Sequence, residues 1–420
     1  MRSLATLAFF CLFNITPLHA DDAPPTSPPA LEQAMDELLT AIRDSAAALR
    51  ADPYYEGDLE QAAGASYWAR MLIRTLEEDI VQDPDFPLFR VVDYRVREGG
   101  DNPDQRYLVA PIRGNQAYRI RGQRAGERRI EVQVYAGRPW TPRGGRVVSV
   151  LTHEQLKIAP DGSVEILIDP QQREGNWLAT AADADMVMVR QVFSDWAHER
   201  AGEFHIDRVG HEGDLRPAED SAAVAARLRR AAANVREVVP LWPRAGRTRW
   251  ARAGENTLTP PSDPSADGGV KGRLMSLGEF RLAPDEALIL TTWLSTANYQ
   301  GVQLTDSWTS SLEYANRQSS LTTDQAWRGK DGAYRFVISH RDPGVQNWLD
   351  TMGLAHGFVL LRYDGLQGSQ IAREHWPRLE KVRFDQLKDK LPPDTPVFDG
   401  AQRSKAILQR RRHVQQRFGV

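Results

Sequence analysis

The sequence is almost free of cysteine. Cys11 is the single thiol among 420 residues, and it lies inside an apolar run at the N-terminus. If that run is removed, the protein has no thiol. Disulfides, Cys-ligated metals and Cys nucleophiles are then excluded, so stability must come from packed cores.

An excess of either charge is also missing. The chain has 53 Lys and Arg residues against 56 Asp and Glu residues, which gives a net charge of −3. No protein-wide field directs such a chain to nucleic acid, and we expect no nucleic-acid partner. The composition is that of an ordinary globular protein, and the length allows two or three domains.

Long hydrophobic runs are confined to the N-terminus. There "LATLAFFCLF" (4–13) follows the basic Arg2, and small Ala20 precedes two aspartates, which is the pattern of a secretory signal peptide. No later segment offers the roughly 18 uninterrupted apolar residues that a spanning helix needs. We therefore expect cleavage near Ala20, export to the periplasm or the medium, and no integral membrane segment afterwards.

Motifs that bind cofactors are absent as well. The sequence has no P-loop, dinucleotide fingerprint, nucleophile elbow or HExxH motif. The segment "HERAGEFHIDRVGHEGD" (198–214) is rich in His and carboxylates, but their spacing matches no metal-ligand pattern. We expect neither a metal nor another cofactor.

Two kinds of sequence pattern, helical and β-type, alternate along the chain. Helical patterns occupy 30–50, 58–80, 218–239 and 401–418, and the first two are candidates for a helical hairpin. Short alternating runs such as "RRIEVQVY", "SVEILID" and "DMVMVRQVF", separated by Gly, Pro and Asp, indicate antiparallel β-sandwiches. The fold class expected is mainly β with α, as two related jelly-roll-like lobes and an N-terminal helical segment.

The β-rich part contains an internal repeat. "DGSVEILIDPQQREGNWLAT" (161–180) matches "DGAYRFVISHRDPGVQNWLDT" (331–351), and "QAYRI" (116–120) matches "EALIL" (286–290) at the same offset. Further on, Arg190 in "MVMVRQV" matches Arg362 in "FVLLRYD". A preserved order and offset indicate a duplicated β-domain.

The secondary-structure patterns and the internal repeat together predict the domain boundaries. The expected order is a signal peptide at 1–20, a disordered spacer at 21–29, a helical segment at 30–99, a first lobe at 100–215, a linker of helix and loop at 216–275, a second lobe at 276–370, and a C-terminal tail with a basic helix at 371–420.

The repeated motifs carry a family resemblance. The pattern "DG-x3-[IF]-x-I … NWL-x-T … [MVL]-R", the segment "GDNPDQRYLVAPIRGNQAYRIRG" (100–122) and the stretch "YANRQSSL" are similar to an uncharacterised bacterial family, domain of unknown function 1214. The likeness extends over roughly 60–400. It implies a β-sandwich or jelly-roll fold, frequent export signals and no particular reaction.

The repeated Asn-Trp-Leu motif has two readings. Asn347 and Trp348, like their counterparts Asn176 and Trp177, fit a structural role in which the indole closes a sandwich core and the amide binds local backbone. A ligand-stacking pair is the alternative. We favour the structural reading because the motif occurs twice in differing contexts.

The residues that precede the second motif have no counterpart in the first. His340 is a possible general acid or base there, with Asp342 to orient it, and Arg341 lies between them. A solvated Asp-Pro-Gly turn is the simpler alternative.

A polar pocket is the second candidate site. Aromatic residues interleaved with amides and charges suit sugars and other polar organic ligands, through stacking and planar hydrogen bonds. The residues predicted to line this pocket, together with Arg341, Asn347 and Trp348, are Trp308, Tyr314, Asn316, Arg317 and Asp350.

Three functions remain open at this point. The first is a binding or accessory protein for a small polar or carbohydrate-like molecule, held between or within the lobes. The second is a metal-independent hydrolase or lyase that uses His340 with Asp342 or Asp350. The third is an interaction scaffold without a small ligand. The sequence does not set the oligomeric state.

Overall fold

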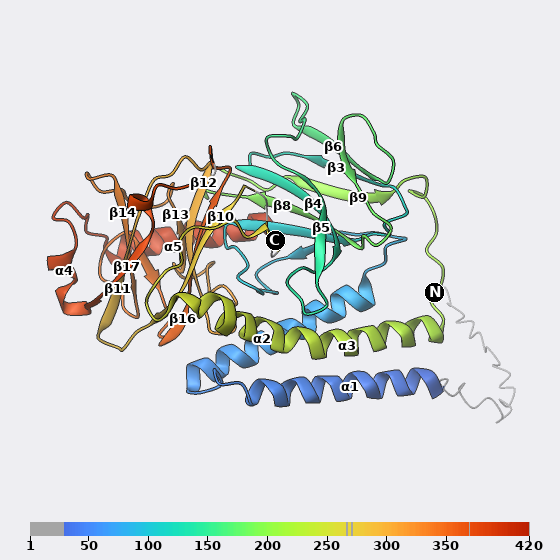
Figure 1. The fold of residues 1–420 in the computed structure, drawn as a ribbon, viewed down its shortest axis with the longest axis horizontal. Helices are drawn as coiled ribbons and strands as arrows, with labels where there is room; N and C mark the ends of the chain where they lie inside the picture. The colour runs from blue at the N-terminus through green and yellow to red at the C-terminus, as the bar shows by residue number, and fades with distance from the viewer. Residues whose placement is uncertain (1–28, 266–267, 270–271, 369, 420) are drawn as a thin grey trace, which may run out of the picture.

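The fold is that of a computed structural model, which describes residues 29–265, 268–269, 272–368 and 370–419. Two β-sandwich lobes stand side by side above a layer of helices (Figure 1). The predicted signal peptide and most of the predicted spacer lie outside the described residues. Within the described part of the chain, no helix is both long and apolar enough to cross a membrane.

The first lobe consists of two sheets. One has the strand order β1-β2-β8-β4-β5 and the other β7-β6-β3-β9. The strands are β1 (Arg90–Val92), β2 (Gln105–Pro111), β3 (Tyr118–Gln123), β4 (Arg129–Gly137), β5 (Gly145–Leu151), β6 (Ser163–Asp169), β7 (Asn176–Ala179), β8 (Met186–Val192) and β9 (Glu203–Arg208). Apolar side chains between the sheets, such as Val132, Ile166 and Val189, form the core of this lobe.

The second lobe repeats this construction. Its sheets have the orders β10-β16-β12-β13 and β15-β14-β11-β17. The strands are β10 (Leu274–Arg281), β11 (Glu286–Trp293), β12 (Tyr299–Thr305), β13 (Ser320–Thr322), β14 (Ala333–Ser339), β15 (Trp348–Asp350), β16 (His356–Asp364) and β17 (Arg378–Arg383). Leu290, Phe336 and Leu361 belong to its separate core.

The predicted mainly-β fold of two related lobes is confirmed. Each strand from β2 to β9 has a counterpart from β10 to β17 at the same place in its sheet, including the parallel pairs β6–β7 and β14–β15. The strand register preserves the repeat, because Ile120 lies opposite Ile166 and its counterpart Leu290 lies opposite Phe336. The first lobe adds β1 at one edge.

The second lobe extends past residue 370. Strand β17 completes its outer sheet, although the sequence places this segment in the C-terminal tail. In β17 only Val382 is buried, so the charged stretch "RLEKVR" shows little of the alternation by which the other strands are recognised.

Three long helices form the layer beneath the lobes. They are α1 (Pro29–Arg50), α2 (Asp58–Leu76), which continues into the π-helical turn η1 (Glu77–Val81), and α3 (Ser221–Ala245), followed by η2 (Gly246–Trp250) and η3 (Ala251–Ala253). Helix α1 runs alongside α3 (Figure 1), so the two N-terminal helices are not a simple hairpin. A core that includes Tyr67, Val235 and Trp308 joins this layer to the second lobe.

The C-terminal part is short and mostly helical. It contains η5 (Arg373–His375), η6 (Phe384–Gln386), α4 (Leu387–Lys390) and α5 (Gly400–Phe418). Asp399 caps α5 in a capping box with Gln402. Helix α5 contacts both lobes, since His413 is hydrogen-bonded to the Glu199 carbonyl and Arg410 to that of Ser320.

Candidate functional site: a cavity between the lobes

A cavity of about 700 Å³ lies between the two lobes. Its walls are the outer faces of the sheets that contain β8 and β16, the end of α3 with η2, the loop around residues 98–101, and residues 262–264 and 268–269. Cavities of this size commonly hold small organic ligands. The site is therefore made by both copies of the duplicated domain.

Alternation along the strands directs every second side chain into this space. In β8, Val187 and Val189 point into the core of the first lobe, whereas Met186, Met188 and Arg190 face the cavity. Strand β16 shows the same alternation in the second lobe, where Leu361 points into the core and Arg362 faces the cavity. A one-residue shift of register would exchange the two faces.

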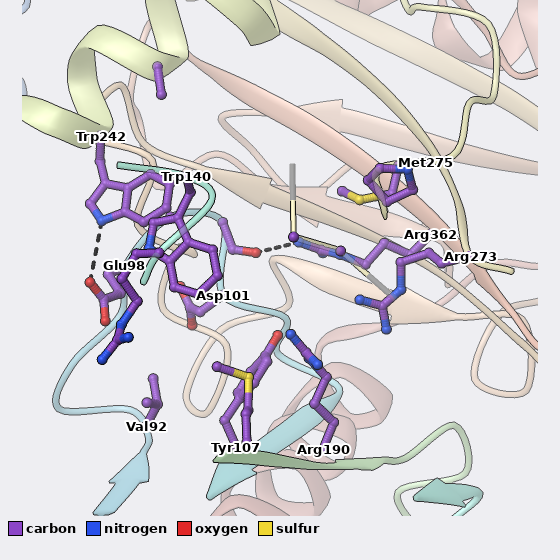
Figure 2. A pocket seen from close by; sticks show the side chains of 18 of the residues that line it. Val92, Glu98, Asp101, Tyr107, Trp140, Arg190, Trp242, Arg273, Met275 and Arg362 are labelled. Atoms are coloured by element: carbon purple, nitrogen blue, oxygen red, sulfur yellow. Dashed lines mark hydrogen bonds between the residues drawn. The ribbon is translucent and has the colours of Figure 1, made fainter. Parts of the chain in front are cut away.

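Arg190 and Arg362 occupy equivalent positions in the two lobes. Arg190 lies opposite Tyr107 of β2, and Arg362 lies opposite Met275 of β10. All four side chains line the cavity, and Figure 2 shows Arg190 beside Tyr107, and Arg362 beside Met275 and Arg273. The duplication has therefore placed one arginine of each lobe in the same space.

Each of these guanidinium groups is held by an equivalent glutamine. Arg190 donates from Nη1 to Gln133, and Arg362 donates from Nη1 to Gln303, which lie at matching places in β4 and β12. Their second partners differ: Arg190 Nη2 donates to the Tyr135 hydroxyl at 3.0 Å, and Arg362 Nη2 donates to the Gly100 carbonyl. A guanidinium has five donor hydrogens, so each arginine keeps others for the cavity.

Neither arginine has a carboxylate partner among the described residues. Both are 6% exposed, so their charges are largely removed from water without a compensating ion pair. Eight arginines and four carboxylates line the cavity in the described part of the chain. Arg74, Arg138 and Arg273 are paired with carboxylates, so only part of this positive charge is available to an anion, and Arg190 and Arg362 belong to that part.

The Tyr107 hydroxyl lies in the electrostatic field of three arginines. Burial raises the pKa of Tyr107, while the positive charges of Arg362, Arg273 and Arg190 act in the opposite direction. The three guanidinium groups are thus close enough to act on one hydroxyl. At this end of the cavity positive charge from both lobes converges.

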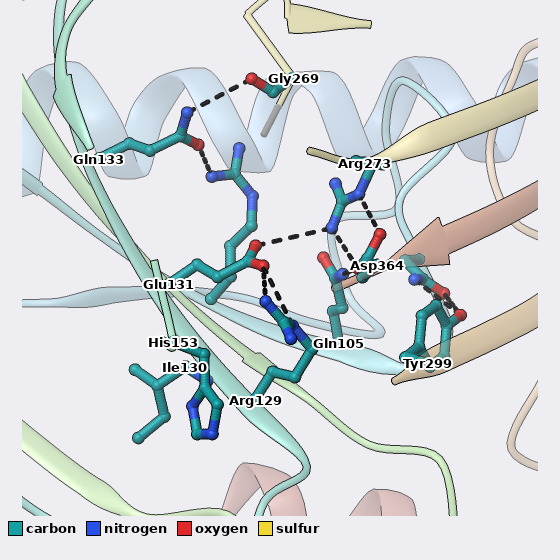
Figure 3. A network of polar contacts seen from close by, with 12 residues as sticks. Gln105, Arg129, Ile130, Glu131, Gln133, His153, Gly269, Arg273, Tyr299 and Asp364 are labelled. Atoms are coloured by element: carbon teal, nitrogen blue, oxygen red, sulfur yellow. Dashed lines mark hydrogen bonds and ion pairs between the residues drawn. The ribbon is translucent and has the colours of Figure 1, made fainter. Parts of the chain in front are cut away.

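A network of buried charges lies next to this end and joins the lobes (Figure 3). Arg273 binds Asp364 through two contacts of 2.6 Å and approaches Glu131 of the first lobe at 3.8 Å. Arg129 also pairs with Glu131, at 3.3 Å. Burial raises the pKa of Glu131, and the neighbouring Asp364 carboxylate adds to this effect. The charge of Arg273 is thus paired with these carboxylates, whereas Arg190 and Arg362 have no such partner among the described residues.

Part of the remaining wall is apolar and aromatic, while charged side chains such as Arg74, Glu78 and Arg138 line other parts. Met186, Met188, Trp140, Trp242 and Trp250 contribute to the apolar and aromatic part, and Figure 2 shows Trp140 and Trp242 on the side away from Arg273 and Arg362. Trp242 is fixed by a hydrogen bond of 3.3 Å from its indole nitrogen to Glu98.

A glycine pair makes this aromatic wall possible. Gly99 and Gly100 have φ angles of 60° and 69°, a region that favours glycine. A Cβ atom would lie 2.5 Å from the Trp242 ring at Gly99 and 2.6 Å from the Trp250 ring at Gly100. Glycine at both positions lets the loop approach the tryptophans closely.

Arg90 adds a buried cation at another part of the wall. It is 5% exposed, and its Nε and Nη1 atoms have no hydrogen-bond partner among the described residues. The carboxylate of Glu77 lies 3.9 Å from Nη1. Buried donors of this kind are normally satisfied, so Arg90 adds a poorly compensated positive charge beside the cavity.

None of the site residues predicted from the sequence lines this cavity. Asn347 accepts a hydrogen bond from Trp327 N and donates to Trp327 O and Arg335 O. Asn176 makes the equivalent three bonds in the first lobe. The indoles of Trp348 and Trp177 donate to backbone carbonyls at the ends of their neighbouring strands.

His340 and its neighbours are occupied by local contacts. The His340 ring is 2.6 Å from the Thr351 hydroxyl and 3.3 Å from the Leu282 carbonyl. Asp342 accepts from Gly344 N and pairs with Arg403 of α5.

The other predicted residues are dispersed. Trp308 is buried against the helical layer, and Tyr314 lies in a separate cluster beneath α5. Arg317 pairs with Asp350 at 2.7 Å, Asn316 accepts a hydrogen bond from Arg411, and Arg341 lies over the Phe384 ring. The catalytic and ligand-binding roles of these residues stay predictions.

One further arrangement resembles catalytic machinery. The Ser307 hydroxyl is 2.7 Å from His356 Nδ1, and His356 Nε2 is 3.3 Å from Glu279. However, Ser307 is 2% exposed, Tyr54 stacks on the imidazole, and none of these residues lines the cavity. This chain of contacts serves the junction between the helical layer and the second lobe.

Sequence reasoning identified Arg190 and Arg362 only as marks of the repeat. Each is a charged residue within a strand that is otherwise almost entirely apolar, "MVMVRQV" and "FVLLRYD". A repeated charge on the face of a buried strand was the signal available for the site.

The fold and the cavity define a class: a duplicated β-sandwich protein with a cavity of small-molecule size between its lobes. Residues 109–194 match the model of a family described as Protein of unknown function (DUF1214). The match confirms the resemblance for the segment from β2 to β8.

A solved structure shares this architecture. A crystal structure of an uncharacterised protein from Burkholderia cenocepacia aligns with 85% of this chain and 98% of its own, at 28% sequence identity and a TM-score of 0.77. A protein of Vibrio parahaemolyticus aligns with 84% of this chain and 100% of its own, but at 9% identity and a TM-score of 0.45, which is too low to support an argument. No curated protein matches the chain.

Proposed function

We propose that this protein binds a small organic anion in the cavity between its lobes. The observation that carries the proposal is the pair of equivalent arginines, Arg190 and Arg362, which face one cavity from two lobes without a carboxylate partner among the described residues. A buried cation is stabilised by a bound anion, so an anionic ligand would neutralise the charges of the two arginines, which no carboxylate of the described residues pairs with.

The charge of the cavity narrows the ligand that the sequence suggested. The aromatic and charged side chains of this lining also suit a sugar, but a neutral sugar would leave the charges of Arg190 and Arg362 without a counter-charge. We therefore place an anion before a neutral sugar. The hydrolase or lyase hypothesis stays a prediction. The cavity does not support it, because the His340 ring lies outside the cavity and is hydrogen-bonded to Thr351 and Leu282.

Calorimetric titration tests the proposal. Hexanoate and benzoate are compared with their neutral amides and with glucose, using the purified protein. We expect the two anions to bind and the amides to bind at least tenfold more weakly. Arg190→Gln and Arg362→Gln should each weaken anion binding about tenfold to a hundredfold, as expected for loss of a charged hydrogen bond.

Arg146→Gln provides the matched control. Arg146 lies on β5 of the first lobe, pairs with Asp183 and does not line the cavity. Its substitution removes the same charge from the protein and should leave anion affinity unchanged. If hexanoate and benzoate bind equally well to all three variants, the arginine pair is not the site; if glucose alone binds, the carbohydrate hypothesis is preferred.

Export is a second part of the proposal. It is supported by the apolar run at 4–13, the small Ala20 and the two aspartates that follow. The mass of the protein recovered from the periplasm or medium should correspond to cleavage near Ala20, and recovery of the uncleaved chain from the cytoplasm would contradict export.

A further inference from the structure

We infer that the ligand is an amphiphilic carboxylate, with its head group at Arg190 and Arg362 and its apolar body along the methionines of β8. The inference rests on the proposed function and specifies the class of anion. It follows from the way charge and apolar surface are arranged along one strand.

The head-group end is defined by residues of both lobes. Arg190 and Arg362 each retain donors, and the Tyr107 ring lies 5.9 Å from the Arg190 guanidinium carbon. A planar carboxylate can accept from two guanidinium groups because it has two oxygens with several lone-pair sites. Arg273, bound to Asp364, is already satisfied.

The body of the ligand is defined by the rest of β8. Met188 and Met186 precede Arg190 by two and four residues on the cavity face. At about 3.4 Å per residue, the apolar strip extends about 14 Å from Arg190 along the strand. Met186 and Met188 are 3% and 9% exposed, so the part of the strip that reaches the cavity is small and largely shielded from water, which suits a hydrocarbon body.

The chemistry of the strip suits a hydrocarbon body. Methionine side chains are flexible and adapt to irregular apolar shapes. Trp140, which also lines the cavity, is packed edge-on against Tyr135 with ring centres 5.6 Å apart. Tyr135 also binds Arg190, so one residue supports both the aromatic wall and the head-group site.

A chain-length series tests this inference. The affinities of acetate, hexanoate and decanoate are measured by calorimetry, with 2-naphthoate as an aromatic alternative. Burial of a methylene group contributes enough for an increase of about fourfold in affinity per carbon. We expect affinity to rise steeply from acetate to hexanoate and to continue rising toward decanoate; a preference for 2-naphthoate would instead assign an aromatic body.

Variants in the strip separate the body from the head. Met188→Gln keeps the length of the side chain and removes its apolar end, so it should weaken decanoate binding about tenfold and leave acetate binding unchanged. Met35→Gln is the matched control, because Met35 lies on α1 and is 53% exposed.

The outcomes distinguish this inference from the proposed function. If acetate, hexanoate and decanoate bind with equal affinity that depends on Arg190, the anion site stands and the amphiphilic ligand is excluded. If no anion of any length binds, the proposed function fails. If decanoate binds equally to the protein and to Arg190→Gln, the cavity binds hydrocarbon without the head-group contact, and the placement of the carboxylate is wrong.

Discussion

Asn176 and Asn347 show at the scale of single residues how a repeated motif can be structural. Each amide links two backbone groups of one residue to a carbonyl of the neighbouring strand: Asn347 joins Trp327 to Arg335, and Asn176 joins Lys157 to Glu165. These bonds fix the crossing between β14 and β15, and between β6 and β7. An amide is suited to the task because it both donates and accepts.

Asn347→Ala should therefore destabilise the fold. The substitution leaves three backbone groups of a buried region without their partner, and we expect a loss of about 3 kcal/mol in the free energy of unfolding. Urea denaturation measures this loss. Asn316→Ala is the control, since Asn316 is exposed and should change stability by less than about 0.5 kcal/mol. Equal, small effects for both would show that the motif does not stabilise the crossing.

Arg190 and Arg362 mark the limit of what single residues reveal in the sequence. Their strands were predicted from apolar runs, and their correspondence was predicted from the repeat. What could not be predicted is that the two strands face each other across one cavity, because this depends on the packing of residues that are 172 positions apart. The candidate His340 attracted attention as a local difference between copies, yet local difference does not identify a concave surface.

Helix α3 shows the same limit at the scale of an element. Its Ala-rich period predicted a helix at 218–239, and the observed element runs from Ser221 to Ala245 with Asp220 as N-cap. The prediction ended early because Pro240 and Pro243 normally terminate a helix. Pro243 leaves the carbonyl of Val239 without its usual donor, and the Tyr67 hydroxyl of α2 supplies one at 2.8 Å. This contact from another helix lets α3 continue to Trp242 in the cavity wall.

Tyr67→Phe should test that arrangement. The variant keeps the buried ring and removes the donor, so the Val239 carbonyl loses its partner at a cost of about 1–3 kcal/mol in the free energy of unfolding. Urea denaturation measures the cost, and the intrinsic fluorescence of the native state should change if Trp242 is displaced. Tyr334→Phe is the matched control, because among the described residues the Tyr334 hydroxyl has no hydrogen-bond partner. If both variants unfold at the same urea concentration, Tyr67 does not support the proline-containing turn.

Helix α5 couples the two lobes at the scale of the whole molecule. It is hydrogen-bonded to the first lobe through His413 and to the second through Arg410, and Arg417 donates to the Pro103 carbonyl. His413 stacks on Trp196 at 5.1 Å between ring centres and is 2% exposed. A neutral imidazole is therefore built into the junction of the lobes and the C-terminal helix.

The protonation of His413 should make acid weaken the fold. Burial, with the positive charge of Arg417 adding to it, lowers the pKa of His413 from 6.5 to about 2. Between these values the unfolded chain binds a proton that the folded protein does not bind, so the free energy of unfolding falls as pH falls below about 6.5. At pH 5 the loss relative to pH 7 is about 2 kcal/mol for this group.

The variant His413→Gln isolates this effect. Asp306, whose pKa burial raises to about 7, acts with the opposite sign, because its folded form binds the extra proton on acidification. A difference between variants is needed for this reason. Urea denaturation at pH 7 and pH 5 should show that the parent protein loses about 2 kcal/mol more than His413→Gln over this interval.

His205→Gln, at an exposed position in β9, should retain the pH dependence of the parent. If His413→Gln also retains it, His413 takes up a proton in the folded protein, and the junction that α5 makes with the two lobes is more open to water than its contacts indicate.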